Sequence, residues 1–303
     1  MTGDPGPGTA FVTGGSGFTG RRVIPELVRR GVTVAALARS DEAARTVAEA
    51  GAEVVRGDLD RPGDLRAALE AGQPDVLVNV ASLGFGHGPG IVAETEAAGV
   101  GRAVFVSTTA IFTTLDAATK GPRLAAEEAV TSSGLAWTIV RPTMIYGRPG
   151  DRNMERLLRS LRRWPAWPVP GGGHRLQQPV HVDDLAAAIA AAAMAPEAAG
   201  QAVQVPGPTP LPFRDIVTQA GAAVGRTPRL VPVPLGPAIA AVAAYERRSA
   251  RPRLRAEQLQ RLDEDKDFDV GPAADLLGHR PRPFSVGIAE EAALLGFDPG
   301  PTR

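Results

Sequence analysis

The residues of this chain whose spacing first suggests chemistry are three glycines, Gly14, Gly17 and Gly20. They follow the apolar residues 10–12 and precede residues 21–30, whose pattern is typical of a helix. Glycine permits a tight turn at the first position, close approach of a phosphate at the second, and close helix–strand packing at the third. The free N–H groups at a helix start favour negative charge. We predict a pyrophosphate-binding turn here; glycines that serve only a sharp turn are the alternative.

Two further positions could select the dinucleotide. Arg39 follows the apolar run 32–38, where a guanidinium could pair with the 2′-phosphate of NADP, whereas a carboxylate would accept from the ribose of NAD. Asp41 lies two residues beyond and leaves NAD as the alternative. Asp58, followed by Leu59, could accept a hydrogen bond from the adenine amino group. A solvated arginine and a turn or capping aspartate are the alternative interpretations.

The elements that must position these residues alternate along the chain. Strands are predicted at residues 10–12, 32–38, 53–56, 75–81, 103–106, 136–140, 179–182 and 202–205. Helices are predicted at residues 21–30, 41–50, 61–71, 90–98, 123–132, 154–163, 183–195, 212–224, 235–248 and 256–262. Apolar strands without two-residue alternation, separated by helices, indicate a parallel sheet buried on both faces. We therefore predict an α/β fold with a doubly wound parallel sheet, a Rossmann fold, and ligands at the carboxyl ends of its strands.

The regular alternation weakens after Arg141. Residues 1–150 are expected to form a dinucleotide-binding domain, to which residues 176–206 return. Residues 151–175 and 207–303 are expected to form a small, mainly helical substrate lobe, with residues 164–173 looping over the cleft. Function is thus expected where the two parts meet.

Composition excludes several classes of function. Lysine plus arginine and aspartate plus glutamate number 33 each among the 303 residues, so the balanced charge gives no sign of a nucleic-acid or membrane partner. The chain has no cysteine, and His174 and His181 lack a carboxylate pattern, so no metal site is predicted. The first nine residues lack the apolar core of a signal peptide. We expect a cytoplasmic protein with a small-molecule substrate, and a homodimer is compatible with this organisation.

Seven segments carry a resemblance to a known family over nearly the whole chain. They are TGGSGFTG at 13–20, GDL at 57–59, NVA at 79–81, FVSTT at 105–109, WTIVRPTMIYG at 137–147, QPVHVDDLA at 178–186 and LGHRPRPF at 277–284. The chain resembles the short-chain dehydrogenase/reductase superfamily, in its extended, NAD-dependent epimerase/dehydratase branch. It is similar in particular to the atypical group that includes the NDUFA9-like proteins.

The resemblance implies roles for particular residues. Thr109 falls where the family keeps a catalytic serine or threonine that hydrogen-bonds the substrate carbonyl. Asp183 or Asp184 would cap the following helix and have no catalytic role. The resemblance places Gly14, Gly17 and Gly20 at the pyrophosphate, Ala81 and Ser82 beside the nicotinamide ribose, and Arg141, Pro142 and Thr143 beneath the nicotinamide. With the residues considered above, the expected cofactor-binding set is Gly14, Ser16, Gly17, Phe18, Gly20, Arg39, Asp58, Leu59, Ala81, Ser82, Arg141, Pro142 and Thr143. The expected cofactor is NADP, with NAD as the alternative.

The chain departs from the family at its usual proton donor, a tyrosine with a lysine four residues later on one helix. The only tyrosines are Tyr146 and Tyr245, and neither has a lysine four residues later. An alignment on Lys120 places Asp116 at the tyrosine position, and an alignment on Glu127 places Thr119 and Arg123 at the two positions. Neither alignment supplies the phenol.

Two side chains could replace the missing donor. Tyr146 follows the Arg-Pro strand, and His87 lies in a glycine-rich loop after the fourth strand, so either could move a proton near the cleft. A packed aromatic and a solvated loop histidine are the alternatives. The sequence thus predicts an NADP-preferring oxidoreductase or epimerase-like enzyme that acts on a small or sugar-like substrate. The alternative is a non-catalytic dinucleotide-binding protein that acts through a protein partner.

Overall fold

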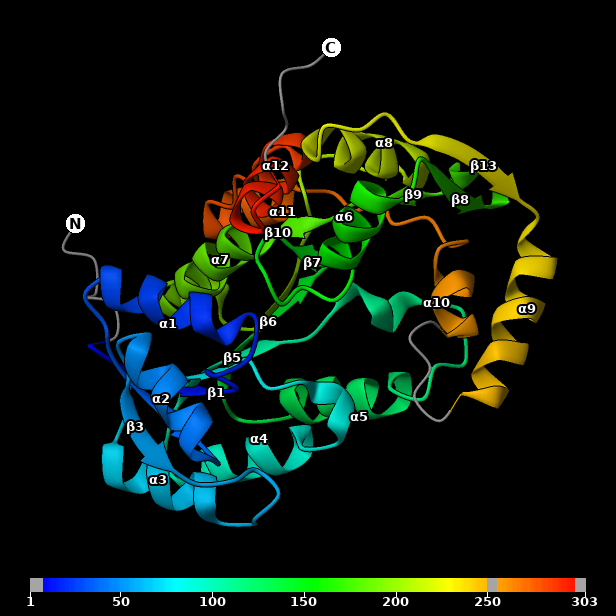
Figure 1. The fold of residues 1–303 in the computed structure, drawn as a ribbon. Coiled ribbons are helices and arrows are strands. Elements are labelled where there is room, and N and C mark those ends of the chain that lie inside the picture. The colour runs from blue at the N-terminus through cyan, green and yellow to red at the C-terminus, as the bar shows by residue number, and fades with distance from the viewer. Residues whose placement is uncertain (1–7, 250–254, 298–303) are drawn as a thin grey trace.

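The computed structural model describes residues 8–249 and 255–297, and its centre is a sheet of seven parallel strands (Figure 1). The strands lie in the order β3-β2-β1-β4-β5-β6-β11. Their bounds are β1 Thr9–Thr13, β2 Thr33–Ala38, β3 Glu53–Arg56, β4 Val76–Asn79, β5 Arg102–Val106, β6 Ala136–Pro142 and β11 Gln201–Val205. The chain runs outward from β1 to β3 and then returns to the other side of β1. The order therefore reverses between β1 and β4, which is the predicted ligand position.

Helices cover both faces of the sheet. They are α1 Gly20–Arg29, α2 Asp41–Glu49 and α7 Val182–Met194 on one face, and α3 Asp64–Gly72, α4 Gly88–Ala97 and α5 Lys120–Thr131 on the other. Successive strand residues point to opposite faces, so Val78 packs with α1 and α7 while Leu77 packs with α3, α4 and α5. Both residues are fully buried. The doubly wound α/β sheet predicted from the sequence is confirmed.

A second core lies beyond β6. It joins α6 Met154–Arg163, α8 Phe213–Ala223 and α12 Phe284–Leu294 through buried apolar side chains such as Leu158, Ile216 and Ile288. Three two-stranded sheets border it. They pair β7 Ile145–Tyr146 with β10 Val180–His181, β8 Ala166–Pro170 with β13 Arg229–Val233, and β9 Leu176–Gln177 with β12 Leu211–Pro212. This mainly helical region closes one side of the edge where the strands end (Figure 1).

Three further helices complete the described part of the chain: α9 Leu235–Arg248, α10 Ala256–Arg261 and α11 Gly271–Leu277. Figure 1 shows α9 and α10 side by side at the margin of the molecule, away from the central sheet. In residues 8–249 and 255–297, no helix combines the length and hydropathy needed to cross a bilayer.

Several boundaries differ from the sequence-based expectation. The strand expected at 179–182 is the short β10, which pairs with β7 outside the main sheet. Helix α3 begins at Asp64 because Gly63, at φ +90°, ends the preceding turn. Helices α11 and α12 were not predicted. Residues 1–7, which belong to the expected first domain, lie outside the described residues.

Candidate functional site

The glycine turn lies at the point where the strand order reverses. Gly14, at φ +70°, has no room for a side chain, because a Cβ there would overlap the backbone nitrogen of Ala81 at the end of β4. A Cβ on Gly20 would overlap the carbonyl oxygen of Gly14. The Thr13 hydroxyl donates to Asn79 Oδ1 at 2.6 Å, which joins the ends of β1 and β4. The first and third glycines therefore permit the close packing of strand, turn and helix.

Gly17 differs from its two neighbours because it is exposed. Within 4 Å, a Cβ on Gly17 would meet one atom outside its chain neighbours, the Gly14 carbonyl oxygen at 3.2 Å. The backbone amides of Ser16 and Phe18 have no acceptor among residues 8–249 and 255–297. The first turn of α1 contains no acidic residue. This open, glycine-floored helix start with free N–H groups fits a pyrophosphate.

The expected nucleotide-side residues lie at the tips of β2 and β3. Arg39 is exposed directly after β2, and its positive charge helps to lower the pKa of Asp60, behind the larger effect of a hydrogen bond from His87. Asp41 is held by Arg56, whose Nη2 lies 2.6 Å from Asp41 Oδ1. The nearby acid that left NAD as an alternative thus has a cationic partner, while Arg39 faces solvent.

Asp58 lies in the turn after β3 and makes local hydrogen bonds. Its backbone amide donates to Asp64 Oδ2 at 2.9 Å, and its Oδ1 accepts from the Asp60 amide at 3.2 Å. These are the contacts of a turn aspartate, which was the alternative interpretation. Leu59 beside it is half-buried against the core under α3. The expected adenine contact of Asp58 therefore stays a prediction.

Ala81 and Ser82 continue β4 toward the cleft. Ala81 contacts the glycine turn, as described above, and Ser82 is exposed, with its Oγ accepting from the Gly84 amide at 3.3 Å. A Cβ on Gly84 would lie 3.2 Å from both Thr119 and Arg123. The backbone after β4 is therefore pinned between the glycine turn and the start of α5.

A cleft with a volume of about 470 Å³ opens at the carboxyl edge of β5 and β6. Thr109 lines it, is 5% exposed, and donates to the Pro142 carbonyl oxygen at 3.3 Å. Thr143 also lines it and donates to the Gln178 carbonyl oxygen. The lining further includes apolar side chains from α6, β8, α8 and α10, namely Met154, Leu157, Trp167, Phe213 and Leu259. Its size lies within the range of roughly 300–1,000 Å³ typical of small-molecule sites.

Residues 262–266, which follow α10, form a strap at this cleft, and Leu262 and Lys266 line it. The Glu264 carboxylate accepts from the Thr113 hydroxyl at 2.7 Å and the Thr114 amide at 2.7 Å, and pairs with Lys266 Nζ at 3.0 Å. Although burial acts to raise it, these hydrogen bonds together lower the pKa of Glu264 to about 2. The carboxylate is thereby kept ionised, and it holds Lys266, which lines the cleft.

Tyr146 does not lie in the cleft. It is 1% exposed and packs within the second core, edge-on to His181 at 5.4 Å and beside Phe284 at 5.0 Å. Burial, with Asp184 as the next cause, raises the pKa of Tyr146. A Cβ on Gly287 of α12 would overlap its hydroxyl. These features match the packed aromatic and do not fit the expected proton donor.

His87 lies away from the Thr109 cleft, on the side of the sheet that α3 and α4 cover. Its Nε2 is 2.7 Å from Asp60 Oδ1, and the residue lines a small pocket of about 180 Å³ between α3 and α4. Among the described residues, that pocket and the Thr109 cleft share no lining side chain. His87 and Thr109 are therefore not brought together, which argues against the expected proton transfer from His87.

Arg141 points into the protein rather than toward the cleft. Its Nη2 lies 2.5 Å from Glu127 Oε2, Glu127 is 6% exposed, and the Ser107 hydroxyl donates to the same carboxylate at 2.5 Å. The guanidinium also lies over the Phe112 ring at 5.5 Å. This buried pair fixes α5 against β5 and β6. Of the expected Arg-Pro-Thr segment, Thr143 lines the cleft.

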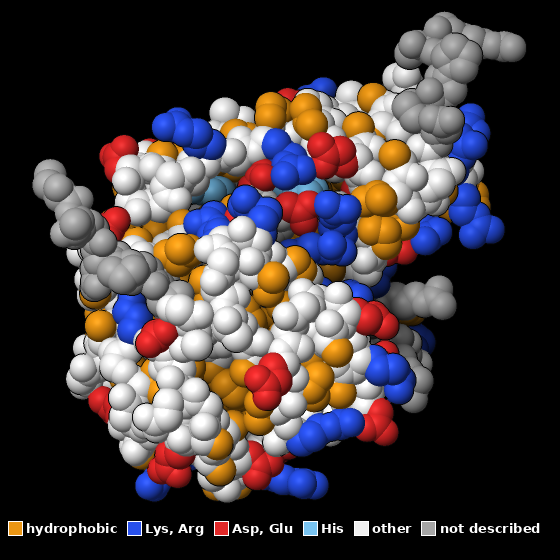
Figure 2. All heavy atoms as spheres, turned by 90° about the vertical axis from the view of Figure 1, so that its left-hand side faces the viewer, with side chains coloured by type: hydrophobic (Ala, Val, Ile, Leu, Met, Phe, Trp, Pro, Cys, Tyr) orange, Lys and Arg blue, Asp and Glu red, His pale blue; other side chains and the backbone are white. Residues whose placement is uncertain are grey.

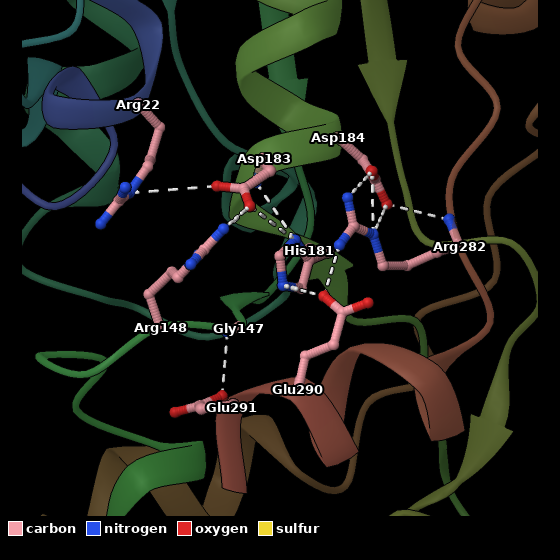
Figure 3. Close-up of polar contacts among 9 residues, drawn as sticks. All are labelled: Arg22, Gly147, Arg148, His181, Asp183, Asp184, Arg282, Glu290 and Glu291. Carbon is pink, nitrogen blue, oxygen red and sulfur yellow. Dashed lines mark hydrogen bonds and ion pairs between the residues drawn. The ribbon is translucent and has the colours of Figure 1, made fainter. Parts of the chain in front are cut away.

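A polar network joins the start of α7 to the loops around it (Figure 3). Arg148 pairs with Asp183, which also lies 3.9 Å from Arg22 of α1. Asp184 binds Arg282, which in turn reaches Glu290 of α12 at 2.6 Å. Figure 2 shows the molecule from the left-hand side of Figure 1, and acidic and basic side chains form a mixed band across the upper half of that view. The network connects the helix after the glycine turn with the C-terminal helices.

The cap of α7 is not the expected aspartate. His181 Nδ1 accepts from the Asp183 amide at 3.2 Å, so Nε2 carries the proton in the neutral ring, and no described residue accepts it. Burial, with Arg282 as the next cause, lowers the pKa of His181. Asp183 and Asp184 instead form the ion pairs just described, which correct the capping prediction.

Some cleft residues were missed by sequence reasoning. Arg261, at the end of α10, and Lys266, in the strap, lie more than 100 residues after Thr109, and no motif marks them. The scarcity of lysine, with Lys120 and Lys266 the only two, was the available signal. Thr119 and Arg123 form a pair, with Arg123 Nη1 donating to Thr119 Oγ1 at 2.7 Å, at the start of α5.

Known proteins of similar sequence and fold agree with this geometry. Over 252 residues the chain is 31% identical to 2-alkyl-3-oxoalkanoate reductase of Stenotrophomonas maltophilia, covering 71% of this chain and 75% of the relative. It is 29% identical over 238 residues to ceramide reductase of Caulobacter vibrioides, covering 75% and 74%. An NADPH-dependent quinone oxidoreductase of Escherichia coli has the same fold, with a TM-score of 0.75, 18% identity and coverage of 95% and 99%.

The family model that matches is described as NAD(P)H-binding and spans residues 14–196. That span begins at the first glycine of the turn and ends just after α7, so it contains the reversal point and the edge of the sheet where Thr109 lies. The narrower NDUFA9-like assignment stays a prediction. With the glycine turn, the sheet order and this match in agreement, the chain belongs to the NAD(P)H-binding family.

Proposed function

We propose that this protein is an NAD(P)H-dependent reductase that converts a carbonyl group of a cleft-bound substrate to an alcohol. The observation that carries the proposal is the shared location of two features. The open glycine turn and the Thr109-lined cleft both lie at the carboxyl edge of the same parallel sheet. Relatives named as reductases of a 3-oxoalkanoate and a ceramide support carbonyl reduction over epimerisation.

The residues of the chain divide the work of such a reaction. The amides at the start of α1 and the exposed Gly17 hold the pyrophosphate, and Arg39 pairs with a 2′-phosphate, which favours NADP(H). When bound, NAD(P)H supplies a hydride to the carbonyl carbon. Thr109 donates a hydrogen bond to the carbonyl oxygen in place of its present bond to Pro142. The apolar walls of the cleft exclude water from the reacting carbonyl.

The proton that completes the alcohol needs a donor other than tyrosine or histidine. Among described residues, the cleft lining contains neither, and Lys266 is its one ammonium. We assign Lys266 as this donor: its proton passes to the carbonyl oxygen as the hydride reaches carbon, and solvent then reprotonates the amine. Glu264 keeps the ammonium in place through the 3.0 Å pair.

The test is turnover followed at the nicotinamide absorbance, with ketones, 3-oxo acids and quinones as a panel and the alcohol identified by mass spectrometry. Lys266→Met should lower kcat by about 10²–10⁴-fold, the usual loss for a proton-transfer group. Thr109→Val should lower kcat by about 10²–10³-fold, the usual loss for one hydrogen-bond donor to the developing oxyanion. Lys120→Met is the matched control, because Lys120 Nζ donates to the Thr113 carbonyl and does not line the cleft. Full activity in Lys266→Met would refute its assignment.

One observation favours a second function. The cleft lacks a phenol and an imidazole among its described lining residues, so the usual chemistry of the superfamily has no donor there. A non-catalytic dinucleotide-binding protein that acts through a protein partner would need none. If no member of the panel oxidises NADPH, while NADPH changes the binding of a partner protein, this second function replaces the first.

A further inference from the structure

The charged side chains that line the Thr109 cleft are all basic. Four basic side chains line it: Arg152 just before α6, Arg156 in the first turn of α6, Arg261 in α10, and Lys266 in the strap. Among the described lining residues there is no aspartate or glutamate. The chain as a whole carries equal numbers of acidic and basic residues, so this bias is local to the cleft. An uncharged or cationic ligand would gain nothing from it.

The remaining lining is largely apolar. Met144, Met154 and Leu157 form the side toward α6, and Trp167 and Phe213 form the side toward β8 and α8. Leu259 and Leu262 add apolar surface from α10. A sugar would leave these surfaces without partners and would bring hydroxyls to them, which costs desolvation. The walls therefore favour a ligand with a hydrocarbon body.

Local partners neutralise part of the basic lining. Arg261 Nη2 lies 2.5 Å from Glu257, although Arg261 Nε is buried without a hydrogen-bond partner. Lys266 is paired with Glu264. Arg152 is exposed and has no ion pair with any described residue. The basic side chain best able to meet a ligand is therefore Arg152, which precedes α6.

We propose that the cleft selects an apolar substrate that carries one anionic group, a carboxylate or a phosphate, held by Arg152 with Arg156 and Arg261. The hydrocarbon body lies between α6, β8 and α10, and the reacting carbonyl lies at Thr109. The statement that this ligand is the substrate rests on the proposed reductase function. The preference of the cleft for an anionic ligand does not depend on that function. The proposal differs from the sugar-like substrate expected from the sequence, because it derives from the lining of the folded cleft.

Binding is tested without turnover, using decanoate, decanol and decylammonium, which share one hydrocarbon chain and differ in charge. Calorimetry with the full chain in the presence of NADP⁺ should show decanoate binding at least about 10-fold more tightly than decanol, the range of a charge-assisted hydrogen bond. Decylammonium should bind most weakly. Raising the salt concentration should weaken the binding of decanoate and leave the binding of decanol unchanged.

The variant that carries the test is Arg152→Gln combined with Arg156→Gln. Both side chains are exposed, so the fold should persist, which a thermal melt checks. This variant should lose most of the preference for decanoate. Arg163→Gln is the matched control, since Arg163 lies exposed on the same helix but outside the cleft. Equal binding of decanoate and decanol by the wild type, or an unchanged preference in the double variant, would overturn the proposal.

The same experiments separate this proposal from the proposed function. Charge-selective binding without reduction of any carbonyl compound would overturn the reductase and leave the anionic, apolar ligand site. Reduction of neutral ketones as fast as of 3-oxo acids of equal length would overturn the site and leave the reductase.

Discussion

Asp184 accepts hydrogen bonds from both the backbone amide of Arg282 at 2.9 Å and its guanidinium at 2.8 Å. One carboxylate at the start of α7 thus fixes the main chain and the side chain of the residue that precedes α12 (Figure 3). The side chains are 13% and 28% exposed, so the pair is only partly accessible to water. The pair ties the start of α7 to the residues just before α12.

Removal of this tie should destabilise the fold. Arg282→Ala leaves Asp184 half-enclosed without its cation, and we expect a loss of about 2–3 kcal/mol in the free energy of unfolding. Arg66→Ala is the control, because Arg66 and Glu70 form an exposed pair expected to contribute under about 1 kcal/mol. Urea denaturation of the two variants measures both values. Equal losses would show that Arg282 is no more than a surface partner.

The glycine turn makes a sharp prediction about cofactor binding. Gly17→Val should abolish NAD(P)H binding while the protein stays folded, because the new side chain meets little protein and enters the space predicted for the pyrophosphate. Gly20→Val should instead prevent folding, since its side chain would overlap the Gly14 carbonyl. Calorimetry with NADPH and circular dichroism distinguish these results. Unchanged affinity in folded Gly17→Val would remove the pyrophosphate assignment.

Cofactor preference depends on the tip of β2. Arg39→Ala should weaken NADPH binding by about 10–100-fold and leave NADH binding nearly unchanged, because a charge-assisted contact to the 2′-phosphate contributes about 1.5–3 kcal/mol. Arg45→Ala is a matched control, being an exposed arginine on α2. Parallel titrations with both cofactors provide the measurement. A wild type that prefers NADH would show that Arg39 serves only as a surface residue.

Two buried carboxyls should make stability depend on pH. Burial, with Asp151 as the next cause, raises the pKa of Glu291 from its ordinary value of 4.5 to about 8. Burial also raises the pKa of Asp151 to about 6. The folded protein therefore holds more protons than the unfolded chain between about pH 4 and pH 8, so stability should fall as the pH rises through that window.

The glutamine variant isolates this effect. In the wild type the Gly147 amide donates to Glu291 Oε2 at 2.9 Å. Glu291→Gln keeps an oxygen acceptor for this amide and removes the group that can ionise. The free energy of unfolding of this variant should match that of the wild type near pH 5 and exceed it by about 2–4 kcal/mol at pH 9. Urea denaturation across this range tests the prediction. Parallel curves for the two proteins would mean that Glu291 is not protonated in the fold.

The sheet and the glycine turn could be predicted from the sequence because their signals are local. Each strand is a short apolar run, and the residues that set the turn, from Gly14 to Gly20, are adjacent in the chain. The packing of Gly14 against Ala81 then follows from the strand order alone. Local patterns therefore sufficed for the central sheet and for the part of the site that the backbone makes.

Side-chain direction and distant walls could not be predicted in the same way. Tyr146 follows the strand that ends at the cleft, yet its side chain packs under α12, because β7 pairs with β10 outside the main sheet. Lys266 is held at the cleft by a hydrogen bond from its backbone amide to the Leu176 carbonyl oxygen and by its pair with Glu264, which itself binds Thr113; no sequence spacing predicts these contacts. These positions depend on how the second core folds onto the sheet, which is a long-range property.

The unequal surroundings of the three glycines bear on how this turn should be recognised in other sequences. Gly14 and Gly20 are demanded by the protein's own backbone, so a descendant that had stopped binding any nucleotide would still need both in order to fold. Gly17 carries no such obligation, since a side chain there would meet mostly empty space. Of the three glycines that make the pattern recognisable, the outer two report on the architecture, and the middle one is the position that we expect to report on a bound nucleotide.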